Sequence, residues 1–122
     1  MRQGLPKLKM RTRAKRDMRQ CLRFIAAQPW GDPAARARAI VHAMNWIRHR
    51  PEWRRVEITR KGSGAQLRRR SAAQFVIIYA YFKPTKLRPK GLVSIRAIRH
   101  RRVRDVFLGV RDTSGEAPPQ YG

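Results

Sequence analysis

Near the start of the chain, apolar residues first occur at every second position and then at every third or fourth position. Around Leu8 and Met10 they alternate with lysine and arginine, which predicts a half-buried strand over residues 7–12. From Arg13 onward they recur at helical spacing with arginines between them, which predicts an amphipathic helix. The apolar stripe of that helix comprises Ala14, Met18, Cys21, Leu22 and Ile25.

A second helix is predicted after a break at residues 28–33. Asp32 is a good N-cap residue, and Pro33 suits the first helical position because no intrahelical N–H is needed there. Basic residues in the last turn suit the negative end of the helix dipole, and Pro51 ends the helix. So short a connection between two helices predicts an antiparallel helical hairpin. The predicted buried face comprises Ala37, Ile40, Val41, Met44 and Ile47.

The second half of the chain returns to period two and predicts three strands. The first covers residues 55–59, and the second covers residues 68–82 and ends in "FVIIYAYF", which is apolar on both faces. A strand that is buried on both faces belongs in the middle of a sheet. The third strand, residues 91–99, is predicted to pair antiparallel with the second. Its alternation points Val93, Ile95 and Ala97 to one face and Ser94, Arg96 and Ile98 to the other.

Together these segments predict one α+β domain, an antiparallel β-sheet in the order β-α-α-β-β-β packed against the N-terminal helical hairpin. The length suits a single core, so the domain is expected to span residues 1–111. A short helix is predicted over residues 101–108. Residues 112–122 are small, polar and rich in proline, which predicts a flexible C-terminal tail.

Composition adds a requirement for an acidic partner. The 122 residues carry 30 Lys and Arg, 23 of them Arg, against 7 Asp and Glu, a formal net charge of +23. Self-repulsion of this size disfavours the free monomer, which points to nucleic acid, an anionic membrane or an acidic protein. A membrane is the weakest of the three, because no apolar run approaches the roughly 20 residues of a membrane span. The single cysteine excludes an internal disulfide and fits a reducing cytoplasm.

Several motifs occur in an order that resembles a known family. Ala14 and Asp17 open the first helix, the second helix ends at Pro51, and Tyr79 lies near the end of an apolar strand. The segment "VSIRAIRHRRVRD" then leads from a strand into a histidine, an arginine and an aspartate. In this combination the chain resembles the RelE/ParE superfamily of toxins from bacterial type II toxin-antitoxin modules, and it is closer to the ParE branch. The last three matched residues are His100, Arg102 and Asp105.

This resemblance implies one of two activities. RelE-like members are ribosome-dependent mRNA endonucleases, and in that branch Arg70, Arg96 and His100 are the candidate catalytic residues. ParE-like members are not enzymes and inhibit DNA gyrase. No tyrosine follows the last strand until Tyr121, which departs from the nuclease pattern and favours the gyrase inhibitor. The candidate target-binding residues are then Arg99, Arg101, Arg102 and Arg104.

The resemblance also implies a partner, an acidic antitoxin that folds on the toxin. It further implies that the toxin binds operator DNA only through this antitoxin. No residue of this chain is assigned to antitoxin binding. Neither a cofactor nor a metal is expected, because the acidic residues form no close pair and one cysteine cannot build a zinc site. Composition alone supports a further alternative, a nucleic-acid-binding protein without enzymatic activity, such as a ribosomal protein.

The remaining candidate residues have a simpler interpretation. His100 suits acid-base chemistry, yet a structural hydrogen bond is its favoured role. The three tryptophans could stack on bases. Their position around the helical hairpin predicts packing instead. They are Trp30, Trp46 and Trp53.

Overall fold

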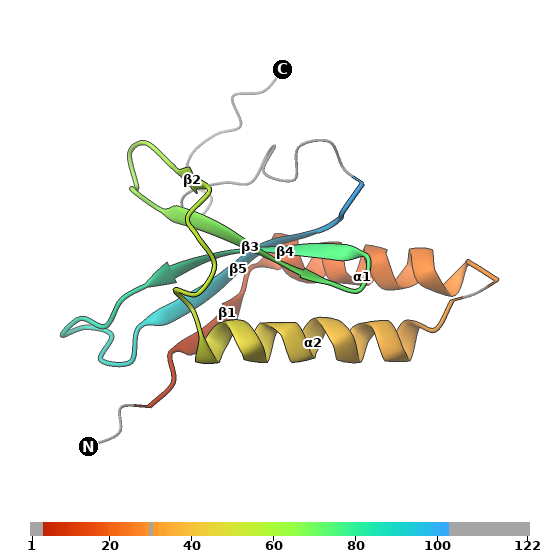
Figure 1. Ribbon diagram of the computed structural model, residues 1–122, viewed down its shortest axis with the longest axis horizontal. Helices are drawn as coiled ribbons and strands as arrows, with labels where there is room; N and C mark the ends of the chain where they lie inside the picture. Colours follow the sequence, from red (N-terminus) through yellow and green to blue (C-terminus); the bar gives the residue numbers. More distant parts are fainter. Residues whose placement is uncertain (1–3, 30, 103–122) are drawn as a thin grey trace.

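A computed structural model of the chain describes residues 4–29 and 31–102. In these ranges the protein forms two helices and a five-stranded mixed sheet, so the predicted α+β class is confirmed (Figure 1). The predicted tail, most of the predicted helix over 101–108, and residues Trp30 and Arg104 lie outside the described residues. The elements are β1 (Lys7–Met10), α1 (Thr12–Ala26), α2 (Pro33–His49), β2 (Ile58–Thr59), β3 (Gln66–Ala72), β4 (Phe75–Phe82) and β5 (Leu92–His100).

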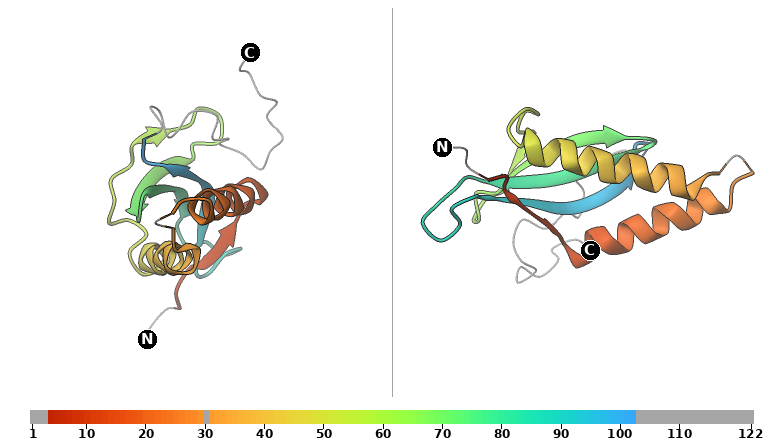
Figure 2. Two further views of the ribbon diagram at one scale, coloured as in Figure 1. Left: turned by 90° about the vertical axis from the view of Figure 1, so that its right-hand side faces the viewer. Right: turned by 90° about the horizontal axis from the view of Figure 1, so that it is seen from below.

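Both helices cover the same face of the sheet (Figure 2). The predicted start of α2 is confirmed, because the Asp32 carboxylate accepts a hydrogen bond from the N–H of Ala35 at 3.0 Å. The apolar stripe of α1 is also confirmed, with Ala14, Cys21 and Ile25 buried. No helix within residues 4–29 and 31–102 is long and apolar enough to cross a bilayer.

The predicted face of α2 is wrong at one position. Val41 is 55% exposed, whereas Ala43 is buried beside Met44. The buried residues of α2 follow the spacing i, i+3, i+4 and i+7, and Val41 lies about 100° around the helix from the first of them. That set is Ile40, Ala43, Met44 and Ile47.

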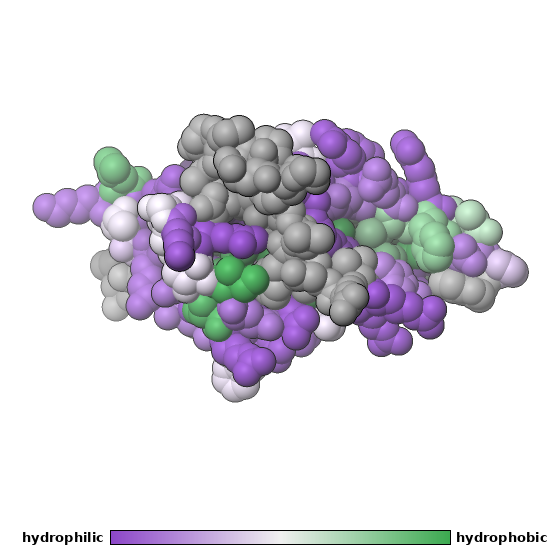
Figure 3. All heavy atoms as spheres, turned by 90° about the horizontal axis from the view of Figure 1, so that it is seen from above, coloured by the Kyte–Doolittle hydropathy of each residue, from purple (hydrophilic) through white to green (hydrophobic). Residues whose placement is uncertain are grey.

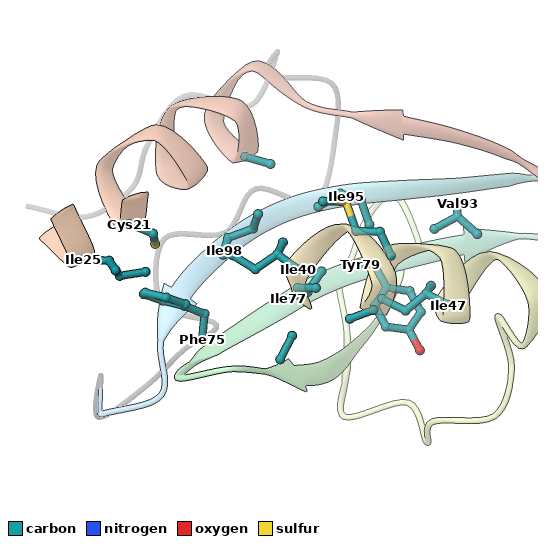
Figure 4. Packing of buried hydrophobic residues seen from close by; sticks show 14 residues of the cluster. Cys21, Ile25, Ile40, Ile47, Phe75, Ile77, Tyr79, Val93, Ile95 and Ile98 are labelled. Carbon is teal, nitrogen blue, oxygen red and sulfur yellow. The ribbon is translucent and has the colours of Figure 1, made fainter. Parts of the chain in front are cut away.

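As predicted, β4 lies at the centre of the sheet. The strand order is β1-β5-β4-β3-β2, and residues 75–80 of β4 are all buried. Alternate residues join two clusters, so that Ile77 and Tyr79 pack beneath the helices while Val76 and Ile78 form a smaller cluster on the other face. The visible surface on the side away from the helices is largely hydrophilic (Figure 3), and the helix-side cluster is shown in Figure 4.

The single strand predicted over residues 68–82 is a hairpin instead. β3 and β4 pair antiparallel from Leu67 with Ala80 to Ala72 with Phe75, around a two-residue turn. Ala73 adopts a φ of 56° in this turn, a conformation usually given to glycine or asparagine, so the sequence carries no turn signal there. The strand predicted over 55–59 is reduced to the two residues of β2.

The sheet is mixed and not antiparallel throughout, which corrects a second prediction. β1 lies parallel to β5, with Leu8 opposite Val93, and the N–H of Arg11 extends the ladder to the carbonyl of Ile95 at 3.0 Å. The pairing joins the first and last strands, so the rule that consecutive strands run antiparallel does not apply to it.

A bulge in β5 reverses its predicted alternation. Ile78 of β4 faces Ala97 and Tyr79 faces Ile95, which leaves Arg96 as an extra residue. As a result Ile98 packs beneath the helices and Ala97 joins the opposite cluster, contrary to the prediction.

The buried centre of the sheet should not tolerate a charge. Ile77 is fully buried, and an unpaired carboxylate there should lower the free energy of unfolding by more than about 3 kcal/mol. The matched control is Val41→Asp, on the exposed side of α2, which should change stability by less than about 1 kcal/mol. Urea denaturation followed by circular dichroism measures both. A folded Ile77→Asp protein with wild-type stability would contradict the central position of β4.

Candidate functional site

An open cleft of about 590 Å³ lies between α1 and the end of β5. Its apolar wall is formed by Phe24 of α1 together with Phe75 and Ile98 of the sheet. Three arginines, Arg13, Arg99 and Arg102, line it as well, and this combination of apolar wall and cations suits an apolar group that carries negative charge nearby.

His100 is held in this cleft by contacts on three sides. Its ring makes edge-to-face contacts with Phe24 and Phe75, with centroid distances of 6.2 and 5.6 Å. The backbone N–H of Arg102 donates to His100 Nδ1 at 3.1 Å, which requires that nitrogen to be unprotonated and leaves the ring proton on Nε2. The predicted structural hydrogen bond is therefore present.

Asp17 ties α1 to β5 at the edge of the cleft. Its carboxylate accepts a hydrogen bond from the N–H of Ile98 at 3.1 Å, and Arg13 lies 4.0 Å away. Burial raises the pKa of Asp17, against the opposing effects of the Ile98 N–H and of nearby arginines, of which Arg13 has the largest effect. The carboxylate thus fixes the position of α1 beside the strand that carries His100.

Cys21 lines the same cleft but is not activated. Burial, with a smaller contribution from Asp17, raises the pKa of its thiol to about 11. A thiol of that pKa is protonated at neutral pH and is a poor nucleophile. Within the described part of the chain no group of three or more His, Cys, Asp and Glu side chains could hold a metal ion. The cleft is therefore equipped to bind a ligand, with no activated nucleophile among these groups.

The structure does not bring the three candidate catalytic residues together. Arg70 lies on the helix side of the sheet, with its guanidinium 4.3 Å from the ring centroid of Trp46. Arg96 lies on the opposite side, 5.9 Å from the ring centroid of Phe82, and His100 occupies the cleft. Both arginines come from inner strands, so one scissile phosphate could not contact both in this arrangement.

The described candidate target-binding arginines lie at the end of β5 and directly after it. Arg101 and Arg102 are exposed, in a turn that is attached to the sheet where the N–H of Arg101 donates to the carbonyl of Gln74 at 2.9 Å. Arg99 is half-buried at the end of the strand. Three of the four predicted residues therefore lie in one short segment, and Arg104 lies outside the described residues.

Sequence analysis missed two aromatic features. Phe24 is exposed on the otherwise basic side of α1, and that break in the polar pattern was the available signal. Trp53 is 73% exposed, so the prediction that it packs around the helical hairpin is wrong, whereas Trp46 packs against the core as predicted.

No family model matches the chain, and no curated protein matches it. The resemblance to the RelE/ParE superfamily therefore stays a prediction that depends on the motifs described above.

The raised pKa of Asp17 predicts a pH-dependent difference between wild type and Asp17→Asn. The folded protein holds the Asp17 proton more tightly than the unfolded chain, so this carboxyl favours folding below its usual pKa of 3.8 and loses that contribution as pH rises through its higher folded-state pKa. The free energy of unfolding of wild type minus that of the variant should therefore fall from about pH 3 to pH 7. Urea denaturation at each pH measures it, and a difference that rises with pH would contradict the burial of Asp17.

Proposed function

We propose that this chain is the toxin of a type II toxin-antitoxin module and that it inhibits DNA gyrase in the manner of ParE. The observation that carries the proposal is the end of β5, where an apolar cleft, a fixed His100 and exposed arginines adjoin one another on a rigid sheet. Such a surface suits recognition of a protein target, because aromatic and arginine side chains are the ones most enriched at binding hot spots.

The order of motifs supports the family part of the proposal. The helical hairpin begins with Ala14 and Asp17, and Asp17 bonds to the strand that leads to His100. Arg102 follows and donates its backbone N–H to that histidine. Two motif residues, His100 and Arg102, thus bond to each other, and a third, Asp17, bonds to the same strand.

A nuclease is less well supported than a gyrase inhibitor. Stabilising the charge that develops on a phosphate requires donors that converge on one position. Arg70 and Arg96 lie on opposite sides of the sheet, and Nδ1 of His100 already accepts a backbone hydrogen bond. RelE-like cleavage of mRNA is therefore the alternative activity, and the experiment below distinguishes it from gyrase inhibition.

The activity is tested by induction in bacteria from a tight promoter, with and without the neighbouring gene. Pulse-labelling measures DNA and protein synthesis separately. We expect growth arrest, an early fall in DNA synthesis and a loss of supercoiling, all relieved by the neighbouring gene. A prompt fall in protein synthesis with cut mRNA would assign the nuclease instead, and unimpaired growth would contradict the toxin proposal.

The residues are tested by the double variant Arg101→Ala, Arg102→Ala, which should fold normally and lose most of its toxicity because both side chains are exposed. The matched control is Arg19→Ala, Arg38→Ala, which removes the same charge from exposed positions on the helices. Equal toxicity of the two double variants would show that net charge, and not the end of β5, determines the activity.

A further inference from the structure

The side chain of Tyr79 is fully buried, yet its hydroxyl has no hydrogen-bond partner within the described residues. The hydroxyl oxygen lies at the margin of the helix-side cluster, well separated from Phe75 and the cleft (Figure 4). A buried hydroxyl without a partner has lost its hydration with nothing to replace it, which destabilises the fold. An unsatisfied group at the edge of a core therefore points to a partner that is supplied from outside.

Arg68 lies opposite Tyr79 on the neighbouring strand β3, and the charges of Arg54 and Arg70 also act on the phenol. Arg68 is only 8% exposed and donates from Nη1 to the carbonyl of Pro51 at 2.6 Å, while its Nε has no partner within the described residues. Arg70 stacks on Trp46 and likewise has an unpartnered, buried Nε. Burial raises the pKa of Tyr79 to about 12, and the charges of Arg68, Arg54 and Arg70 oppose that rise, as expected of cations close to the phenol.

No carboxylate in the described ranges compensates this charge. Glu57 pairs with Arg69 at 2.7 Å, and Glu52 lies 3.7 Å from Lys83. Neither forms an ion pair with Arg54, Arg68 or Arg70. Like charges at such proximity repel one another, and the repulsion is strongest where burial lowers the local dielectric constant. Within the described residues, these three arginines therefore form no ion pair that would offset their charge.

We propose that Arg54, Arg68, Arg70 and Tyr79, here called the tyrosine-arginine site, bind the carboxylate of a glutamate or aspartate from an acidic peptide. The planar fork of a guanidinium matches a carboxylate in two-point geometry, and the phenol supplies a further donor. Arg54 is exposed and Arg70 is half-buried, so these two are the arginines of the site that are most accessible to solvent.

A carboxylate fits this position better than the phosphate of a nucleic acid. The phenol is fully buried, and a carboxylate on a flexible side chain is the less hindered of the two anions. A phosphodiester is flanked by two sugars, which hold it away from a buried donor. The inference does not depend on the identity of the target in the proposed function.

The test uses the full chain with Trp30→Phe and Trp53→Phe, so that Trp46 beneath Arg70 is the remaining tryptophan and reports on the site by fluorescence. The probe is a synthetic peptide of Glu, Ala and Leu, and the control peptide carries Gln in place of each Glu. We expect Tyr79→Phe and Arg70→Gln each to weaken binding of the acidic peptide by about tenfold. The matched charge control, Arg38→Gln on the exposed side of α2, should weaken it by less than about twofold.

Thermal unfolding distinguishes binding from a merely structural role. Without peptide, Tyr79→Phe should melt at or above the temperature of the wild type, because the variant lacks the unpartnered hydroxyl. With peptide, the wild type should gain more than the variant. Equal effects of Arg70→Gln and Arg38→Gln would overturn the proposal in favour of general charge attraction. Loss of binding to a single-stranded oligonucleotide, with peptide binding unchanged, would overturn it in favour of phosphate.

Discussion

The register between β4 and β5 is the constraint on which the remaining structure depends. β4 is buried on both faces, so its neighbours must present apolar residues to each side, and a one-residue slip would reverse them. The bulge at Arg96 introduces such a reversal within β5 itself. Without it, Arg96 and His100 would share a face by simple alternation. With it, His100 turns toward α1 and Arg96 toward Phe82, so one extra residue both forms the cleft and separates two candidate catalytic groups.

The position of α1 follows from the same register. The N–H of Ile98, just after the bulge, is the donor that the Asp17 carboxylate accepts. That bond joins residues 81 apart in the sequence and is partly buried, so it places Phe24 on α1 opposite His100 on β5. Burial of the carboxylate has an electrostatic cost, which is visible in the raised pKa of Asp17. We infer that the bond specifies the position of the helix more than it stabilises the fold.

Residue type predicted the cap at Asp32. Periodicity predicted both helices and the central position of β4, because each depends on the spacing of apolar residues along one element. It failed where the decisive interaction joins distant elements. The turn at Ala73 contains neither glycine nor asparagine, and the bulge at Arg96 is set by pairing with β4. Likewise, two arginines of β3 and Arg54 act on the phenol of Tyr79 only once the sheet has formed. The residue pattern within one segment cannot predict contacts of this kind between segments.

The structure also explains part of the high arginine content, which the composition alone showed only as an excess of positive charge. On the helix side, Arg50 and Arg70 lie over the ring of Trp46; on the other side, Arg88 and Arg96 lie over the ring of Phe82. A flat, weakly hydrated guanidinium can stack on an aromatic ring and remain charged in a half-buried place, whereas an ammonium holds its water more strongly. Each such contact contributes about 0.5–2 kcal/mol. Part of the arginine content therefore belongs to the packing, and the net charge overstates what the surface offers to a partner.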